Sequence, residues 1–119
     1  MRYAISILLA LLAVNAANAQ AFVGRWYGDN DPQACKGKRG DRVAPIEYTA
    51  TEVYGMETPC QIVKWTPKGA AIEMTLRCRD ERGRYDAPFR ETIVVQGQQL
   101  KNTKVFEGKK MTFTYKRCP

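Results

Sequence analysis

Apolar and polar residues alternate with a period of two in several short stretches of the chain, and this pattern predicts β-strands. The clearest stretch lies near the C-terminus, where three large side chains occupy every second position: Met111, Phe113 and Tyr115. Residues 89–96 and 100–106 are further strand candidates, separated by turns at residues 97–98 and 107–110. No stretch after residue 19 has a convincing 3.6-residue apolar period, so we expect an all-β fold.

Residues 54–78 contain the hairpin around which the expected fold is organised. Its turn is predicted at residues 67–70, and Cys60 and Cys78 lie at nearly equal distances on either side of Gly69. The hairpin therefore places these two cysteines opposite one another. Three apolar residues of its arms are expected in the core: Ile62, Met74 and Leu76.

The first half of the domain contains fewer and less regular strand candidates. Residues 22–28 predict a first strand, residues 29–41 a loop, and residues 42–53 a half-buried strand that begins at an edge position because of Pro45. Short strands at regular spacing indicate a sandwich or a barrel. We expect a small antiparallel barrel of about 7 or 8 strands, because closure of the first strand on the last removes exposed sheet edges.

The first 19 residues have the features of a secretory signal peptide and are excluded from the expected fold. Arg2 supplies the positive start, residues 4–14 are apolar apart from Ser6, and Ala17-Asn18-Ala19 is a cleavage motif. The apolar run is shorter than the roughly 20 residues that a membrane-spanning helix needs. We therefore expect one domain, residues 20–119, in the periplasm or secreted.

The four cysteines of an exported domain are expected to form two disulfides. Zinc binding is the competing interpretation, but the chain has no histidine and no C-x-x-C pair, and a closed site would need all four cysteines. With Cys60 opposite Cys78, Cys35 is left to pair with Cys118. That second bridge would tie the segment after the first strand to the last strand.

Charge and composition favour binding over catalysis. Without Arg2 the domain has 18 basic and 12 acidic residues, a net charge of +6, which favours anionic partners but can also serve solubility alone. The absence of histidine removes the commonest general base, and the only serine, Ser6, lies in the signal peptide. A carboxylate pair for glycoside hydrolysis is conceivable, but carboxylates in loops are usually just solvated. We expect no enzyme activity, no cofactor or metal, and no nucleic-acid partner for an exported protein.

Two loops are candidates for binding. Lys36, Lys38 and Arg39 form a basic run that suits an anionic glycan or phosphate, although such runs are more often solvated surface. The same loop contains Arg39-Gly40-Asp41, the tripeptide that integrins read, and a match of this length is common by chance.

The second loop carries Tyr54, Met56 and Glu57 just before Cys60. A rigid loop with these side chains suits a protein partner, because preorganisation lowers the ordering cost of association. The alternative is that Tyr54 and Met56 cap the barrel. Three large aromatic residues could line a ligand cavity but are expected to fill the core: Trp26, Tyr27 and Trp65.

Short motifs in the chain resemble known families. Residues 24–28, G-R-W-Y-G, resemble the G-x-W signature that begins lipocalin-like barrels, although the domain is shorter than a lipocalin. The Y-G-M-E run before Cys60 and the Y-K-R-C run ending at Cys118 are similar to small exported, cysteine-bearing barrels of Gram-negative bacteria. Members of that group with a known role are mostly inhibitors of C-type lysozyme or of secreted metalloproteases.

The resemblance implies an inhibitor of a peptidoglycan hydrolase of the lysozyme or muramidase type. We expect a monomer that acts through the loop of Tyr54, Met56 and Glu57. The Ser-Gly-x-x-Tyr loop of the lysozyme inhibitors is missing here, and basic animal lysozyme would repel a domain of charge +6. An acidic or bacterial muramidase is therefore the easier target. The alternatives are an envelope-binding module for anionic lipopolysaccharide or peptidoglycan, a protease inhibitor, or a small-ligand carrier with a cavity beside Trp26.

Overall fold

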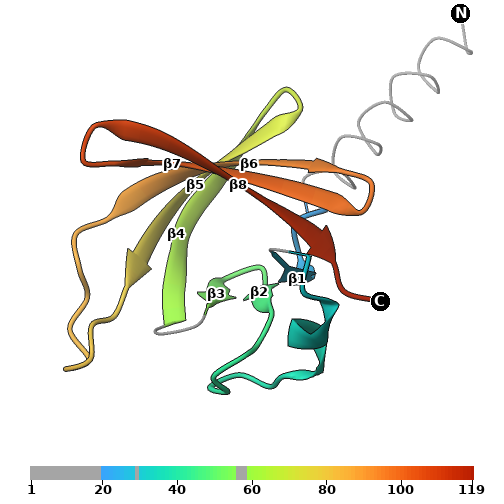
Figure 1. Ribbon diagram of the computed structural model, residues 1–119. Coiled ribbons are helices and arrows are strands. Elements are labelled where there is room, and N and C mark those ends of the chain that lie inside the picture. The colour runs from blue at the N-terminus through green and yellow to red at the C-terminus, as the bar shows by residue number, and fades with distance from the viewer. Residues whose placement is uncertain (1–19, 29, 56–58) are drawn as a thin grey trace, which may run out of the picture.

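The computed structural model describes residues 20–28, 30–55 and 59–119, so the expected signal peptide lies outside the described residues (Figure 1). Eight antiparallel strands of this described part follow one another around a closed barrel. The strands are β1 (Gly24–Tyr27), β2 (Ile46–Tyr48), β3 (Glu52–Tyr54), β4 (Pro59–Lys68), β5 (Ala71–Cys78), β6 (Phe89–Gln96), β7 (Gln99–Phe106) and β8 (Lys109–Arg117). The predicted small antiparallel barrel with two disulfides is thereby confirmed.

Strand length divides the barrel into two unequal parts. β1, β2 and β3 have three or four residues each, whereas β4 to β8 have eight to ten. In Figure 1 the three short strands lie at the bottom, and the β7–β8 hairpin crosses above them. The hairpin predicted at residues 67–70 is the long β4–β5 pair, in which Cys60 lies directly opposite Cys78.

The prediction of one strand over residues 42–53 was wrong. The chain forms β2 and β3 there, with a tight turn between them. Thr49 holds this turn, because its hydroxyl oxygen accepts hydrogen bonds from the backbone N–H groups of Thr51 (3.2 Å) and Glu52 (2.9 Å). A threonine side chain that satisfies two backbone donors competes with continuation of the strand.

The segment around β1 also differs from its prediction. The strand is shorter than residues 22–28, since Phe22 lies before it in a turn and is nevertheless fully buried. The predicted loop contains a 3-10 helix, η1 (Pro32–Lys36), capped by the Asp31 side chain, which accepts a hydrogen bond from the Gln33 N–H.

No helix of the described residues is long and apolar enough to cross a membrane.

The core gathers where the short strands close the barrel. Its buried residues come from seven strands and the turn before β1: Phe22, Trp26, Tyr48, Val53, Ile62, Ile72, Met74, Leu76, Ile93 and Leu100. Trp26 is fully buried, its indole N–H donates to the Phe22 carbonyl at 3.0 Å, and Trp65 packs edge-on against the Phe22 ring. Trp26 is therefore part of the packed core, as expected from the sequence. Tyr27 was expected in the core but is only partly buried, because successive residues of a strand face opposite sides.

The barrel closes along a very short seam. β1 pairs with β8 at only two positions, Trp26 with Arg117 and Tyr27 with Lys116. The Cys35–Cys118 disulfide, with Cα atoms 5.7 Å apart, joins the loop after β1 to the residue that follows β8. Both predicted disulfides are therefore formed, and one of them reinforces the seam.

Arg117 is the second element that holds this seam. Its guanidinium lies 4.2 Å from the centre of the Trp26 ring and donates hydrogen bonds to the carbonyls of Ala21 (2.9 Å) and Val23 (3.2 Å). Glycine is favoured at position 24 beside it, because the φ of +146° is a backbone conformation that other residues rarely adopt. One side chain thus joins the start of the described chain to its last strand.

Candidate functional site

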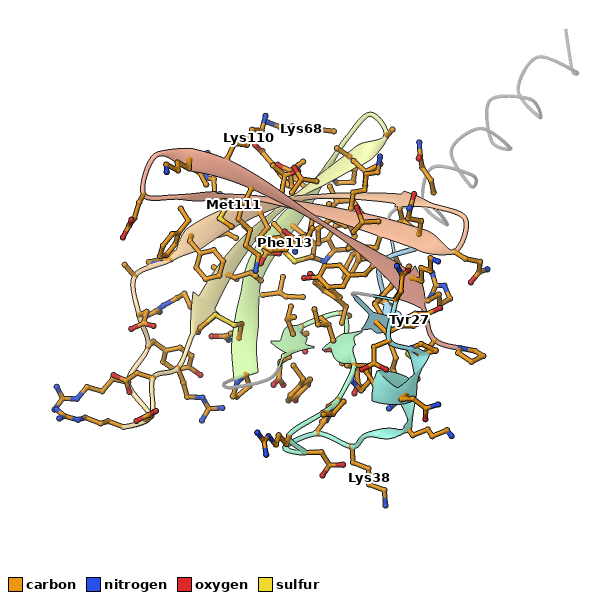
Figure 2. All side chains as sticks on the ribbon, in the orientation of Figure 1. Tyr27, Lys38, Lys68, Lys110, Met111 and Phe113 are labelled. Carbon is orange, nitrogen blue, oxygen red and sulfur yellow. A yellow bond between two sulfur atoms is a disulfide. The ribbon has the colours of Figure 1, made fainter. Side chains whose placement is uncertain are left out.

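The inner face of β6, β7 and β8 changes from buried to exposed toward the β7–β8 turn. The sheet register aligns two rows of inward-facing residues across these strands: Ile93, Asn102 and Phe113 in one, and Glu91, Lys104 and Met111 in the other. Ile93 is fully buried, whereas Phe113 is 38% exposed and Met111 42% exposed. Figure 2 shows Met111 and Phe113 on the inner side of the β8 ribbon and Lys110 on the other side.

Two more aromatic residues belong to this surface. Phe89 lies opposite buried Leu76 and is 36% exposed, and Phe106 follows Lys104 by two positions and is 64% exposed. We call Phe89, Phe106, Met111 and Phe113 the open inner face. These side chains stay accessible because β1, β2 and β3 are too short to extend the opposite wall of the barrel that far. Several large apolar side chains exposed together are typical of an interaction site.

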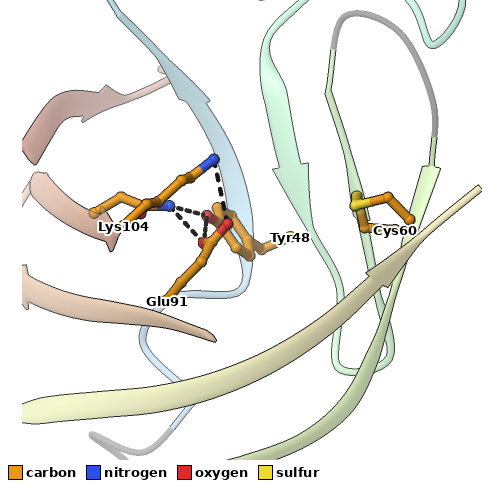
Figure 3. Close-up of a disulfide and its surroundings, with 6 residues drawn as sticks. Tyr48, Cys60, Glu91 and Lys104 are labelled. Atoms are coloured by element: carbon orange, nitrogen blue, oxygen red, sulfur yellow. Dashed lines mark hydrogen bonds and ion pairs between the residues drawn. A yellow bond between two sulfur atoms is a disulfide. The ribbon is translucent and has the colours of Figure 1, made fainter. Parts of the chain in front are cut away.

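A buried polar cluster lies at the base of the open inner face (Figure 3). Asn102 donates from Nδ2 to Glu91 Oε2 (2.6 Å) and to the Tyr48 hydroxyl oxygen (3.0 Å), and the side chains of all three residues are almost completely buried. Lys104 Nζ lies 3.3 Å from Glu91 Oε1. The lysine balances the buried carboxylate, which would otherwise be very costly to remove from water.

The cluster affects the pKa of Tyr48 and the amide orientation of Asn102. Burial, together with the negative charge of Glu91, raises the pKa of the Tyr48 hydroxyl well above its ordinary value. Asn102 Oδ1 is buried and has no hydrogen-bond partner among the described residues, while the opposite amide orientation would place that oxygen against the Glu91 carboxylate. Glu91 holds Lys104 at the edge of the open inner face, with the ammonium 5.9 Å from the centre of the Phe113 ring. The open inner face therefore combines aromatic side chains with a positioned cation.

The basic loop predicted from the sequence is only partly available for an anion. Arg39 donates two hydrogen bonds to the Glu47 carboxylate, at 2.7 Å and 3.1 Å. These hydrogen bonds lower the pKa of the Glu47 carboxyl, and the same contact raises the pKa of the Arg39 guanidinium. Lys36 and Lys38 are exposed on the same loop. In the Arg39-Gly40-Asp41 tripeptide, the Asp41 carboxylate accepts a hydrogen bond from the Lys38 backbone N–H at 2.8 Å, so both charged side chains have partners within the chain.

Tyr54, the described member of the second predicted loop, makes contacts within the domain. The Arg39 guanidinium lies 3.7 Å from the centre of the Tyr54 ring, and the tyrosine hydroxyl donates to Glu52 at 2.7 Å. That hydrogen bond to a carboxylate raises the pKa of Tyr54. Met56 and Glu57 lie outside the described residues, so the proposed binding role of this loop stays a prediction.

Sequence reasoning missed the polar cluster and the open inner face, although a signal for the cluster was present. Asn102 and Lys104 occupy inward positions of an alternating strand, and Glu91 does so on the strand beside it. Polar residues at positions that the period assigns to the core indicate either a buried network or an exposed surface. In the described part of the chain, no group of three or more potential ligands is placed to hold a metal ion.

Comparison with protein-family models, with curated proteins and with solved structures found no match for this chain.

Proposed function

We propose that the mature domain is an exported, non-catalytic protein that inhibits a peptidoglycan-cleaving enzyme and binds it through the open inner face. The observation that carries this proposal is the exposure of Met111, Phe113 and Phe106 on the side of the strands that faces the barrel interior. Aromatic residues and methionine are enriched at protein interfaces. Their strands are anchored in the core at the other end, so the surface is largely preorganised.

The positive charge of the β7–β8 hairpin favours a target enzyme with an acidic cleft. Residues 99–117, which form the β7–β8 hairpin, contain six basic residues and one acidic residue. Enzymes that cleave glycosidic bonds usually carry a pair of carboxylates beside the bond that they break. A basic hairpin with exposed aromatic side chains complements such a cleft, and it would be repelled by a strongly basic muramidase.

The test is to titrate residues 20–119 into a panel of acidic and basic muramidases and to follow peptidoglycan lysis. We expect loss of activity near equimolar protein for an acidic bacterial enzyme, with weaker inhibition at higher salt because exposed charges are screened. Phe113→Asp should abolish inhibition. Val63→Asp is the matched control, since Val63 is also an exposed apolar residue, 51% exposed, but lies on β4. Unchanged lysis by every enzyme at large molar excess would contradict the proposal.

A further variant separates the two candidate contact surfaces. Tyr54→Ala removes the described side chain of the loop that the sequence favoured, and it leaves the open inner face intact. If Tyr54→Ala abolishes inhibition while Phe113→Asp does not, the enzyme contacts the loop and the assignment of the open inner face is wrong.

Binding to an anionic envelope glycan is the second candidate function. It is supported by the exposed Lys36 and Lys38, and Figure 2 shows Lys38 at the far end of the molecule from Lys110. This function predicts salt-sensitive co-sedimentation with purified peptidoglycan or lipopolysaccharide. Replacing Lys36 and Lys38 by glutamine should abolish it, and unchanged co-sedimentation of that variant would exclude these lysines.

A further inference from the structure

β8 is an edge strand along most of its length. It pairs with β7 over eight positions but with β1 only at Lys116 and Arg117. Within the described residues, the backbone of residues 109–114 therefore has a neighbouring strand on one side only. The unpaired N–H and C=O groups of such an edge can pair with a strand from another chain.

The chain turns away at Gly28, which is why β1 does not cover this edge. The Asp31 N–H donates to the Gly28 carbonyl at 3.1 Å, and η1 begins directly afterwards. A Cβ atom at Gly28 would lie 3.1 Å from the Tyr115 ring, so the backbone is already in close contact with β8 there. Beyond this point lies a groove of about 510 Å³, lined by Tyr27, Asn30 and β8 residues 112–116 among others.

We infer that the free edge of β8 binds an extended segment of a partner protein in which acidic and apolar residues alternate, and that this segment adds to the sheet as a further strand. Strand addition derives affinity from backbone hydrogen bonds and specificity from alternate side chains. On the inner side, the added strand would lie beside Met111 and Phe113, which suits apolar residues. On the outer side it would lie beside Lys110, Thr112 and Thr114, and the positive charge of Lys110 suits acidic residues.

Charge distinguishes this occupant from a second copy of the chain. β8 has no acidic residue, so a second copy of β8 paired along this edge would offer Lys110 no carboxylate partner. Like charges opposite one another destabilise a strand pair, whereas opposite charges stabilise it. Residues 109–114 are long enough for a segment of about 20 Å, at roughly 3.4 Å per residue.

This inference depends on the proposed function only in taking a protein as the partner. It does not require that the partner is a muramidase. Peptide binding without enzyme inhibition would remove the proposed function and leave strand addition intact. Inhibition by a protein whose β8 edge binds no acidic peptide would remove strand addition alone.

The experiment uses synthetic peptides with the mature domain. The probe alternates Asp or Glu with Val or Ile, and its counterpart has lysine at every acidic position. Two further versions of the acidic peptide carry N-methyl groups on alternate residues, in opposite phases, so that each removes the backbone donors of one edge of the added strand. We expect the acidic probe to bind and to slow amide exchange in β8, and one N-methylated version to bind at least tenfold more weakly than the other.

A pair of charge reversals provides the matched variants. Lys110→Glu alters β8 itself, whereas Lys101→Glu makes the same change one strand away, on the same outer face. Lys110→Glu should weaken binding of the acidic probe about fivefold more than Lys101→Glu does. The inference is wrong if the acidic probe does not bind, if the lysine counterpart binds equally well, or if the two N-methylated versions bind alike. Dimerisation of the domain alone through β8 would also overturn it.

Discussion

The β1–β8 seam and the β7–β8 turn lie at opposite ends of the same two-stranded hairpin. Inward-facing side chains are buried near the seam and exposed near the turn. Leu100 and Phe106 both face inward on β7, but Leu100 is fully buried and Phe106 is 64% exposed. At the seam, β1 and the residues before it cover the inner face. Toward the turn, the three short strands no longer extend far enough to cover it. Strand alternation therefore determines where a side chain points, and the length of the opposing strands determines whether it is buried.

The buried polar cluster marks the boundary between these two regions. Ile93 and Leu100 pack in the core on one side of it, and Met111 and Phe113 are exposed on the other. Asn102 and Glu91 are satisfied mainly by one another, by Tyr48 and by Lys104. Because the cluster is hydrogen-bonded, the hydrophobic core can end there without leaving the buried Glu91 carboxylate uncompensated.

The largest effect is expected from opening the seam. Replacing Cys35 and Cys118 by alanine removes a cross-link over a sequence separation of 83 residues and should cost about 4–5 kcal/mol in the free energy of unfolding. The corresponding change at Cys60 and Cys78, with a separation of 18, should cost about 3 kcal/mol. Urea unfolding under non-reducing conditions measures both. A larger loss from the Cys60 and Cys78 variant would mean that the seam is not where closure is weakest.

The next effect compares the two regions directly. Leu100→Ala creates a cavity in the closed region and should cost about 2–5 kcal/mol. Phe113→Ala truncates a larger side chain in the open region, where a third or more of the surface is already exposed, and should cost less than about 1 kcal/mol. Similar losses in chemical denaturation would show that the open inner face is part of the core.

A smaller effect than that of Leu100→Ala is expected at the boundary. Tyr48→Phe removes one buried hydroxyl from the cluster and should cost about 1 kcal/mol at neutral pH. The raised pKa of Tyr48 means that, above about pH 10, the unfolded chain loses this proton before the folded protein does. Stability should therefore fall as pH rises from about 10 through the folded pKa, and Tyr48→Phe should make that fall less steep. Thermal unfolding between pH 8 and about 11 measures it, with the exposed Tyr85→Phe as control. An unchanged slope in the Tyr48 variant would contradict the burial of this hydroxyl.

The sequence was sufficient to predict most of the strands, the main hairpin and both disulfides. These features follow from contacts between residues near in sequence, or from the fact that one cysteine pair leaves only one pairing for the other two. The turn at Gly69 brings Cys60 opposite Cys78, and elimination pairs the other two cysteines. The division of residues 42–53 into β2 and β3 was missed, because it depends on a local side-chain bond from Thr49 that competes with an acceptable strand pattern. Arg39 was predicted as an anion ligand, whereas Glu47 and Tyr54, eight and fifteen residues away, occupy its guanidinium.

The sequence by itself determined the class of fold, the pairing of the cysteines and the direction in which each side chain of β8 points, since all of these follow from a period of two and from spacing along the chain. Only the tertiary structure decided that Met111 and Phe113 are exposed, that Glu91 and Lys104 meet, and that β8 keeps a free edge. These properties depend on how far β1, β2 and β3 extend across the barrel. The burial of a side chain depends on strands that are distant in sequence, so it cannot be predicted from a local sequence pattern.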